Sequence, residues 1–150
     1  MKKRIDWKVI SWSFAAVAAT AVLGSLWTDI GPWYESIKPS ITPPSFVFPI
    51  VWTALYFMIF FAMYLSISKS RKKTLISCIF GINLAMNALW TLFYFKMRNP
   101  ALAFIDIIVM LATIAYLILL SCKIDKKAAY LLIPYLLWVL FAAVLNYLSI

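Results

Sequence analysis

The sequence predicts an all-α integral membrane protein: a bundle of five transmembrane helices with a long proline-rich loop between helices 1 and 2. Of the 150 residues, 65% are hydrophobic and only 13% are charged, whereas an average soluble chain carries about 25% charged residues. Five apolar stretches, each near the ~20 residues needed to cross a bilayer, use up most of the chain. Residues 1–150 are therefore expected to form a single membrane domain, without a separate soluble one.

The five predicted spans follow one another closely, except after the first. We place them at about residues 9–27, 45–68, 74–95, 101–121 and 128–149. The apolar run of the first span continues well past Ala16-Val17-Ala18, which resembles a signal-peptide cleavage site. We therefore expect the first span to remain uncleaved.

The basic residues indicate the orientation of the spans. Eleven of the fourteen lie on one side of the predicted membrane: Lys2, Lys3, Arg4 and Lys8, then Lys69, Arg71, Lys72 and Lys73, then Lys123, Lys126 and Lys127. The positive-inside rule places the N-terminus in the cytoplasm and the C-terminus outside, in what we expect to be a bacterial cell membrane. The net charge of +9 does not indicate nucleic-acid binding, because no helix offers a long basic face.

The first connection, about residues 28–44, is much longer than the others. Pro39, Pro43 and Pro44 oppose helix there, because each proline fixes φ and removes an amide donor. Loops of this length in a compact fold tend to be lids or binding loops, although a loosely ordered connector is the alternative. The neighbouring Trp33 and Tyr34 favour a lid on the outer side of the bundle.

The third span has two contrasting faces. One face carries Asn83, Asn87, Trp90 and Tyr94 at helical spacing. Polar side chains in a membrane helix usually point into the bundle. This face either borders an internal pocket or only bonds adjacent helices, and we favour the pocket. The opposite face is built of small residues and is predicted to pack against a neighbouring helix or a second protomer: Ser77, Gly81, Ala85 and Ala88.

The tryptophans divide into two groups. Those near the ends of spans suit the interfacial aromatic belt: Trp7, Trp12, Trp27 and Trp33. Trp52, Trp90 and Trp138 lie deeper, where the belt explains them less well. Pro134, one turn before Trp138, removes a backbone hydrogen bond and is expected to bend the last helix.

Conventional catalytic and metal-binding groups are scarce. The chain has no histidine, which removes the usual haem ligand, the usual zinc ligand and the commonest general base, so we expect no metal and no cofactor. Cys78 and Cys122 are read as inert buried thiols. Asp106 is the only acid well inside an apolar run, and is either a functional carboxylate or, as we favour, the partner of Lys96 or Arg98 in an ion pair.

Several separated motifs together resemble the TspO/MBR family, the tryptophan-rich sensory proteins that include the translocator protein (peripheral benzodiazepine receptor). They are Trp33-Tyr34, Lys38-Pro39-Ser40, Pro43-Pro44, Val51-Trp52 and Leu55-Tyr56, then Asn87, Trp90, Phe95 and Asp106, and finally Pro134-Tyr135, Trp138, Phe141-Ala142 and Leu145-Asn146-Tyr147. They occur in the family's order over nearly the whole chain. Where relatives often carry a tryptophan before the proline pair, this chain has Ile41.

The resemblance implies a dimeric five-helix bundle that binds flat hydrophobic ligands, such as protoporphyrin IX, in a pocket beneath the first loop. By position, the pocket would use Tyr34, Pro43, Phe48, Trp52, Tyr56, Asn83, Asn87, Trp90, Trp138 and Ala142. The resemblance also implies light-dependent degradation of porphyrin at Trp52 and Trp138, as catalytic residues. Sterol binding is not expected, because only Leu-Ser-Ile follows Tyr147 where the sterol pattern requires a basic residue.

The function predicted from the sequence is therefore a porphyrin-binding membrane protein, linked to tetrapyrrole metabolism or stress sensing, that acts as a homodimer in the lipid bilayer. The alternative is a small transporter of porphyrin-like metabolites, although the chain shows no internal repeat of the kind that transporters usually have. A purely structural role as a membrane partner subunit is the third reading.

Overall fold

The computed structural model describes residues 5–150, so Lys2, Lys3 and Arg4 of the predicted orientation signal lie outside the described residues. The long helices are α1 (Trp7–Trp27), α3 (Val47–Lys69), α4 (Lys73–Thr91), α5 (Pro100–Ile124) and α6 (Lys126–Tyr147), and a π-helical turn η1 (Leu92–Lys96) extends α4. Five helical segments are long and apolar enough to cross a membrane. The predicted fold class, an all-α membrane bundle of five spans, is confirmed.

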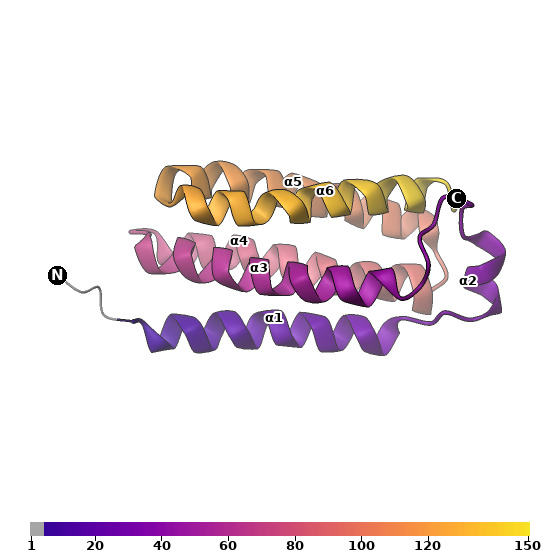
Figure 1. Cartoon of the computed structure of the whole chain (residues 1–150), viewed down its shortest axis with the longest axis horizontal. Helices are drawn as coiled ribbons and strands as arrows, with labels where there is room; N and C mark the ends of the chain where they lie inside the picture. The colour runs from indigo at the N-terminus through magenta and orange to yellow at the C-terminus, as the bar shows by residue number, and fades with distance from the viewer. Residues whose placement is uncertain (1–4) are drawn as a thin grey trace.

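The helices lie nearly parallel to one axis, as Figure 1 shows. In that view α3 and α4 run between α1 on one side and the α5–α6 pair on the other. The contacts agree, because α5 packs on α6, α3 packs on α6, α4 packs on α5, and α1 contacts both α3 and α4. Short connections join antiparallel neighbours, so the C-terminus lies at the same end of the bundle as the segment that follows α1 (Figure 1).

Three of the long helices begin at residues whose side chains cap free backbone amides. Asp6 accepts a hydrogen bond from the amide of Val9 at 3.3 Å and starts α1. Asn99 accepts from the amide of Leu102 at 3.0 Å and is followed by Pro100 in the first turn of α5. Because the first helical amides have no partner within the helix, such caps stabilise a helix by about 1 kcal/mol each. The capping residues therefore mark where these helices begin, at the ends of the bundle that face water.

The connection between α1 and α3 contains a short helix that was not predicted from the sequence, because prolines indicated a loop. It is α2 (Pro32–Ile37), a short helix lying across the end of the bundle (Figure 1). Pro32 occupies the first turn, where a missing amide costs nothing. The helix ends at Ile37, and its C-cap Lys38 is extended because a residue that precedes proline, here Pro39, is disfavoured in the α region. The prolines therefore set the limits of this helix.

The outer surface of the bundle is apolar. Phe57, Phe61, Ile105 and Leu137 are each at least half exposed and point away from the core, as expected where lipid replaces water as the solvent. Cys78 and Cys122 lie on this outer surface as free thiols. The prediction that they are buried is wrong, because an apolar stretch that faces lipid has the same composition as one that faces the protein core.

Candidate functional site

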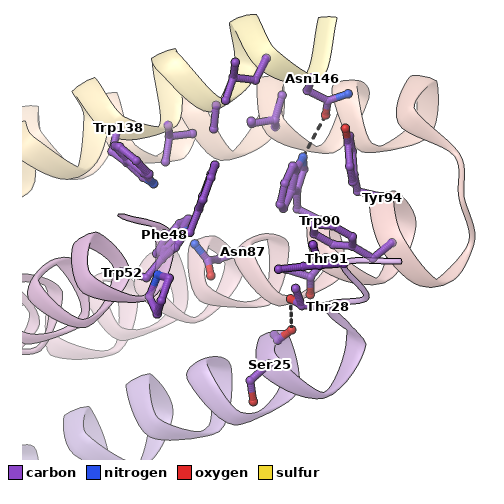
Figure 2. A pocket seen from close by; sticks show the side chains of 18 of the residues that line it. Ser25, Thr28, Phe48, Trp52, Asn87, Trp90, Thr91, Tyr94, Trp138 and Asn146 are labelled. Carbon is purple, nitrogen blue, oxygen red and sulfur yellow. Dashed lines mark hydrogen bonds between the residues drawn. The ribbon is translucent and has the colours of Figure 1, made fainter. Parts of the chain in front are cut away.

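A cavity of about 550 Å³ lies inside the bundle, toward the end covered by α2. Its lining residues come from the five long helices, from α2 and from the segment that follows α2. Figure 2 shows side chains of α1, α3, α4 and α6 converging on it. None of these lining residues is Lys, Arg, Asp or Glu, so the cavity is apolar with a few neutral polar groups.

One wall of the cavity is formed by rings from α3 and α6. The rings of Phe48 and Trp138 meet edge to face at 5.8 Å between centroids, and Trp52 lies 5.5 Å from Tyr56 on the next turn of α3. Among the described residues, no hydrogen bond engages the indole N–H of Trp52 or of Trp138. Both indoles therefore offer a flat face and an unused donor to whatever occupies the cavity.

The facing wall is held by hydrogen bonds between α4, η1 and the end of α6. Trp90 and Tyr94 stack at 5.0 Å between centroids with an interplanar angle of 23°. The indole N–H of Trp90 donates to Oδ1 of Asn146 at 2.9 Å (Figure 2), and the hydroxyl of Tyr94 donates to Ser149 at 2.9 Å. With its donor already engaged, Trp90 serves as a fixed ring of the wall.

A continuous chain of hydrogen bonds runs from the cavity into the core. The hydroxyl of Tyr56 donates to Asn87 at 3.0 Å, the amide of Asn87 donates to Tyr135 at 3.2 Å, and Tyr135 donates to Asn83 at 3.0 Å. The amide of Asn83 ends the chain by donating to Thr113 at 2.8 Å. The chain links α3, α4, α5 and α6 and satisfies polar groups that would be costly if left unpaired in an apolar interior.

At one end of the cavity, rings from α2 form a lid that packs against η1. Tyr34 lies 5.5 Å from Phe95 and 6.4 Å from Tyr94 between ring centroids, and Trp33 contacts Tyr94 at 5.8 Å. Desolvation raises the pKa of the Tyr34 hydroxyl, with smaller contributions from Tyr94 and Glu35. Tyr34 therefore remains neutral over the physiological pH range.

Arg98 connects this lid to the turn between η1 and α5. Its guanidinium carbon lies 5.9 Å from the centroid of the Trp33 ring, within cation–π range. The backbone of Arg98 has a φ of 52°, the left-handed region that a bulky residue rarely adopts. Together with the π-helical turn just before it, this conformation marks a strained backbone at the rim of the cavity.

Eight of the ten predicted binding residues line the cavity: Tyr34, Phe48, Trp52, Tyr56, Asn87, Trp90, Trp138 and Ala142. Pro43 and Asn83 do not line it. Asn83 is fully buried and only bonds adjacent helices, whereas Asn87 both lines the cavity and bonds Tyr56 and Tyr135. Ile41 is 54% exposed and does not line the cavity.

Several lining residues were missed by sequence reasoning. The largest group is a stripe of small and polar residues at the C-terminal end of α1 and its cap: Ala21, Gly24, Ser25 and Thr28. Their helical spacing was a readable signal of one interior face. Asn146 was also missed as a wall residue, although an amide side chain inside an apolar span usually has a partner within the bundle.

Asp106 does not make the predicted ion pair. It is 5% exposed, and none of the ion pairs among residues 5–150 joins it to Lys96 or Arg98. Lys96 ends η1 and Arg98 lies on the turn before α5, and both are exposed, whereas Asp106 faces the core from the second turn of α5. Its Oδ2 atom has no hydrogen-bond partner, and Asp106 does not line the cavity.

Comparison with known proteins supports the resemblance noted in the sequence. The sequence model of the TspO/MBR family matches residues 13–149. The tryptophan-rich protein TspO of Archaeoglobus fulgidus is 35% identical over 90% of each chain. The tryptophan-rich sensory protein of Cereibacter sphaeroides is 32% identical over 95% of this chain and 90% of its own. The translocator protein of Ovis aries is 31% identical over 77% of this chain and 71% of its own.

Proposed function

The chain belongs to the TspO/MBR family, and from this premise we propose that it is a membrane binding protein for flat hydrophobic ligands of the porphyrin class. The observation that supports the proposal most strongly is the cavity of about 550 Å³ with aromatic rings on facing walls. Small-molecule sites typically enclose about 300–1,000 Å³, with apolar and aromatic walls and few polar groups. Rings on two walls suit a ligand that is itself a wide, flat ring system.

The distribution of charge suggests how such a ligand would lie. Because the lining has no ionic side chain, burying a carboxylate inside the cavity would be costly. Two cations lie beside the lid: Arg98, over the Trp33 ring, and Lys38, which follows α2 and pairs with Glu35 at 2.6 Å. A porphyrin with carboxylate side chains would therefore place its apolar edge inward and its carboxylates at the rim, beside Arg98.

Light-dependent degradation of the bound porphyrin is the finer part of the proposal. Trp52 and Trp138 would be the reacting residues, because both line the cavity and neither uses its indole N–H elsewhere among the described residues. An indole in contact with a photoexcited porphyrin is an oxidisable partner that can pass an electron to the excited ring or react through oxygen. Illumination of the complex tests this part alone. A porphyrin spectrum that bleaches in the wild type and persists in Trp52→Phe, with binding retained, is the expected result.

The binding proposal is tested by filling the cavity. Ala142 lines the wall beside Trp138 on α6, so Ala142→Phe would place a ring where the ligand lies. We expect purified Ala142→Phe to lose the saturable change in the porphyrin absorption band that the wild type shows with protoporphyrin IX. Ala112→Phe, on the exposed face of α5, is the matched control and should bind normally. Equal binding by both variants would place the ligand outside this cavity.

A further inference from the structure

A second hollow lies at the end of the bundle opposite the lid. It is a groove of about 210 Å³ between the α3–α4 connection and the end of α5, lined by Ser70, Arg71, Lys72, Leu75, Ile76, Leu120, Lys123 and Ile124. We propose that this groove, whose surface is apolar and whose lining residues include three cations, is a binding site for an anionic phospholipid. The proposal is independent of the porphyrin site, which shares no residue with the groove.

The three cations of the groove have no acidic partner. Two acids lie at this end of the bundle, and both are already engaged: Asp6 pairs with Lys73 at 3.3 Å, and Asp125 pairs with Lys69. The three other acids of the chain are Asp29, Glu35 and Asp106, which lie in the lid segment or in the outer half of α5. Arg71, Lys72 and Lys123 take part in no ion pair among the described residues, so the groove carries about three uncompensated positive charges.

The floor of the groove is apolar. Ile76 is buried, Leu120 and Ile124 are half-buried, and Leu75 is 44% exposed. Leu75 and Ile76 come from the first turn of α4, just inside Arg71 and Lys72, and Leu120 lies one turn before Lys123 on α5, whereas Ile124 follows Lys123 at the end of that helix. The order of chemistry along the groove, charge at the aqueous end and hydrocarbon toward the bilayer, matches that of a phospholipid. A free phosphate would leave the apolar floor without a partner.

The connection that carries two of the cations is held in place. The hydroxyl of Ser70 accepts a hydrogen bond from the backbone amide of Lys72 at 2.9 Å, which closes a tight turn between α3 and α4. Arg71 and Lys72 therefore start from a fixed backbone rather than from a long flexible loop. The positive-inside rule accounts for cations at this end but not for a groove beneath them. The same rule predicts that this end faces the cytoplasmic leaflet, where anionic lipids are concentrated.

The test compares two triple variants that remove the same charge. Full-length protein in detergent is titrated with phosphatidylglycerol or phosphatidylcholine, and retained lipid is counted by native mass spectrometry. We expect the wild type to retain one phosphatidylglycerol in preference to phosphatidylcholine. Arg71→Gln/Lys72→Gln/Lys123→Gln should weaken that retention on the order of 100-fold, since each cation near a membrane surface contributes about a factor of five. Lys8→Gln/Lys126→Gln/Lys127→Gln, outside the groove at the same end, should retain the lipid.

A second pair of variants tests the apolar floor with every charge in place. Leu75→Trp fills the groove from its exposed side and should lower phosphatidylglycerol retention, whereas Leu119→Trp, on the lipid-facing surface of α5, should not. Equal loss in both triple variants would show general surface attraction and overturn the proposal. Displacement of the lipid by millimolar inorganic phosphate would also overturn it, because the site would then recognise the phosphate alone. Undiminished retention in Leu75→Trp would contradict the assignment of the floor.

Discussion

The indole of Trp90 and the side chain of Asn146, 56 residues apart in sequence, are joined by a hydrogen bond of 2.9 Å that ties α4 to α6 at the cavity wall. Asn146 also donates to the carbonyl of Pro100 at 2.8 Å and so links the start of α5. One amide thus joins three helices at the end of the bundle that α2 covers. The stacked Trp90 and Tyr94 rings owe their orientation to this arrangement.

Asn146→Leu should destabilise the protein by about 1–2 kcal/mol, because it removes two interhelical hydrogen bonds and leaves their partners unpaired. The free energy of unfolding in mixed detergent micelles measures the effect. Tyr147→Phe, at the exposed neighbouring position, is the control and should leave the free energy unchanged. Wild-type stability in Asn146→Leu would mean that the bond to Trp90 contributes little.

Tyr135→Phe should also destabilise the protein by about 1–2 kcal/mol. The change keeps the ring and its edge contact with Trp52 at 6.3 Å, but it breaks the hydrogen-bond chain between Asn87 and Asn83. Tyr130→Phe, on the exposed side of the same helix, provides the matched comparison. Similar unfolding curves for the two variants would argue against the buried chain as a stabilising element.

Asp125 makes stability depend on pH at the end of the bundle opposite the lid. Its hydrogen bond to Lys69, with a smaller contribution from the amide of Lys127, lowers its pKa below the usual value of 3.8. Because the pKa is lower in the folded state than in the unfolded state, the ionised carboxylate stabilises the fold at pH values above its unfolded-state pKa. This stabilisation is lost as the pH falls through the folded-state pKa. Asp125→Asn keeps the cap of α6, because asparagine caps as well as aspartate.

Asp125→Asn should therefore be less stable than the wild type at pH 7, and the difference should shrink below about pH 4. Thermal unfolding at a series of pH values measures it. Asp6→Asn is the comparison, and its effect should be smaller because the pair with Lys73 is more exposed to solvent. A difference that grows at low pH would reverse the assigned sign.

Arg98→Asn should weaken the binding of protoporphyrin IX by about two- to fivefold, because an ion pair with a solvent-exposed charge at the rim contributes only that much to affinity. Asparagine tolerates the left-handed backbone at this position, so the turn is preserved. Binding of the dimethyl ester of the same porphyrin should not change, because the ester has no carboxylate to lose a partner. A parallel loss for the acid and the ester would mean that Arg98 acts through the Trp33 contact instead.

Gly81 tests the proposed homodimer. A Cβ atom at Gly81 would meet nothing within 4 Å inside the protomer, so a side chain at this position starts from open space. If the small-residue face of α4 is the dimer interface, leucine will separate the protomers and shift the mass measured by light scattering in detergent toward that of a monomer. Ala112→Leu on α5 is the control. An intact dimer in Gly81→Leu would exclude this face.

Hydrophobic pattern and charge were enough to predict the five spans, because a bilayer demands long apolar helices whatever their contacts. The face carrying Asn87 and Trp90 was also predictable, since helical spacing alone puts these residues on one side. Pattern could not assign Asn83 and Asn87 to different roles, because they share a face and differ only in what lies opposite. The partner of Asp106 was mispredicted for a similar reason, since closeness in sequence to Lys96 and Arg98 says little about which way a helix faces. The helix α2 was missed because its limits are set by prolines that in isolation indicate a loop.

The central claim is that a flat aromatic ligand binds between the walls of the cavity, against Trp52 and Trp138. Its most direct test is a tryptophan-fluorescence titration with protoporphyrin IX, comparing wild type, Trp52→Phe/Trp138→Phe and the control Trp7→Phe/Trp12→Phe, whose changed residues are exposed at the other end of the bundle. We predict saturable quenching in the wild type and in the control. Binding to Trp52→Phe/Trp138→Phe should be at least about tenfold weaker, because the variant loses the binding free energy of two indole contacts with the ligand. Affinity in Trp52→Phe/Trp138→Phe equal to that of the wild type would contradict the claim.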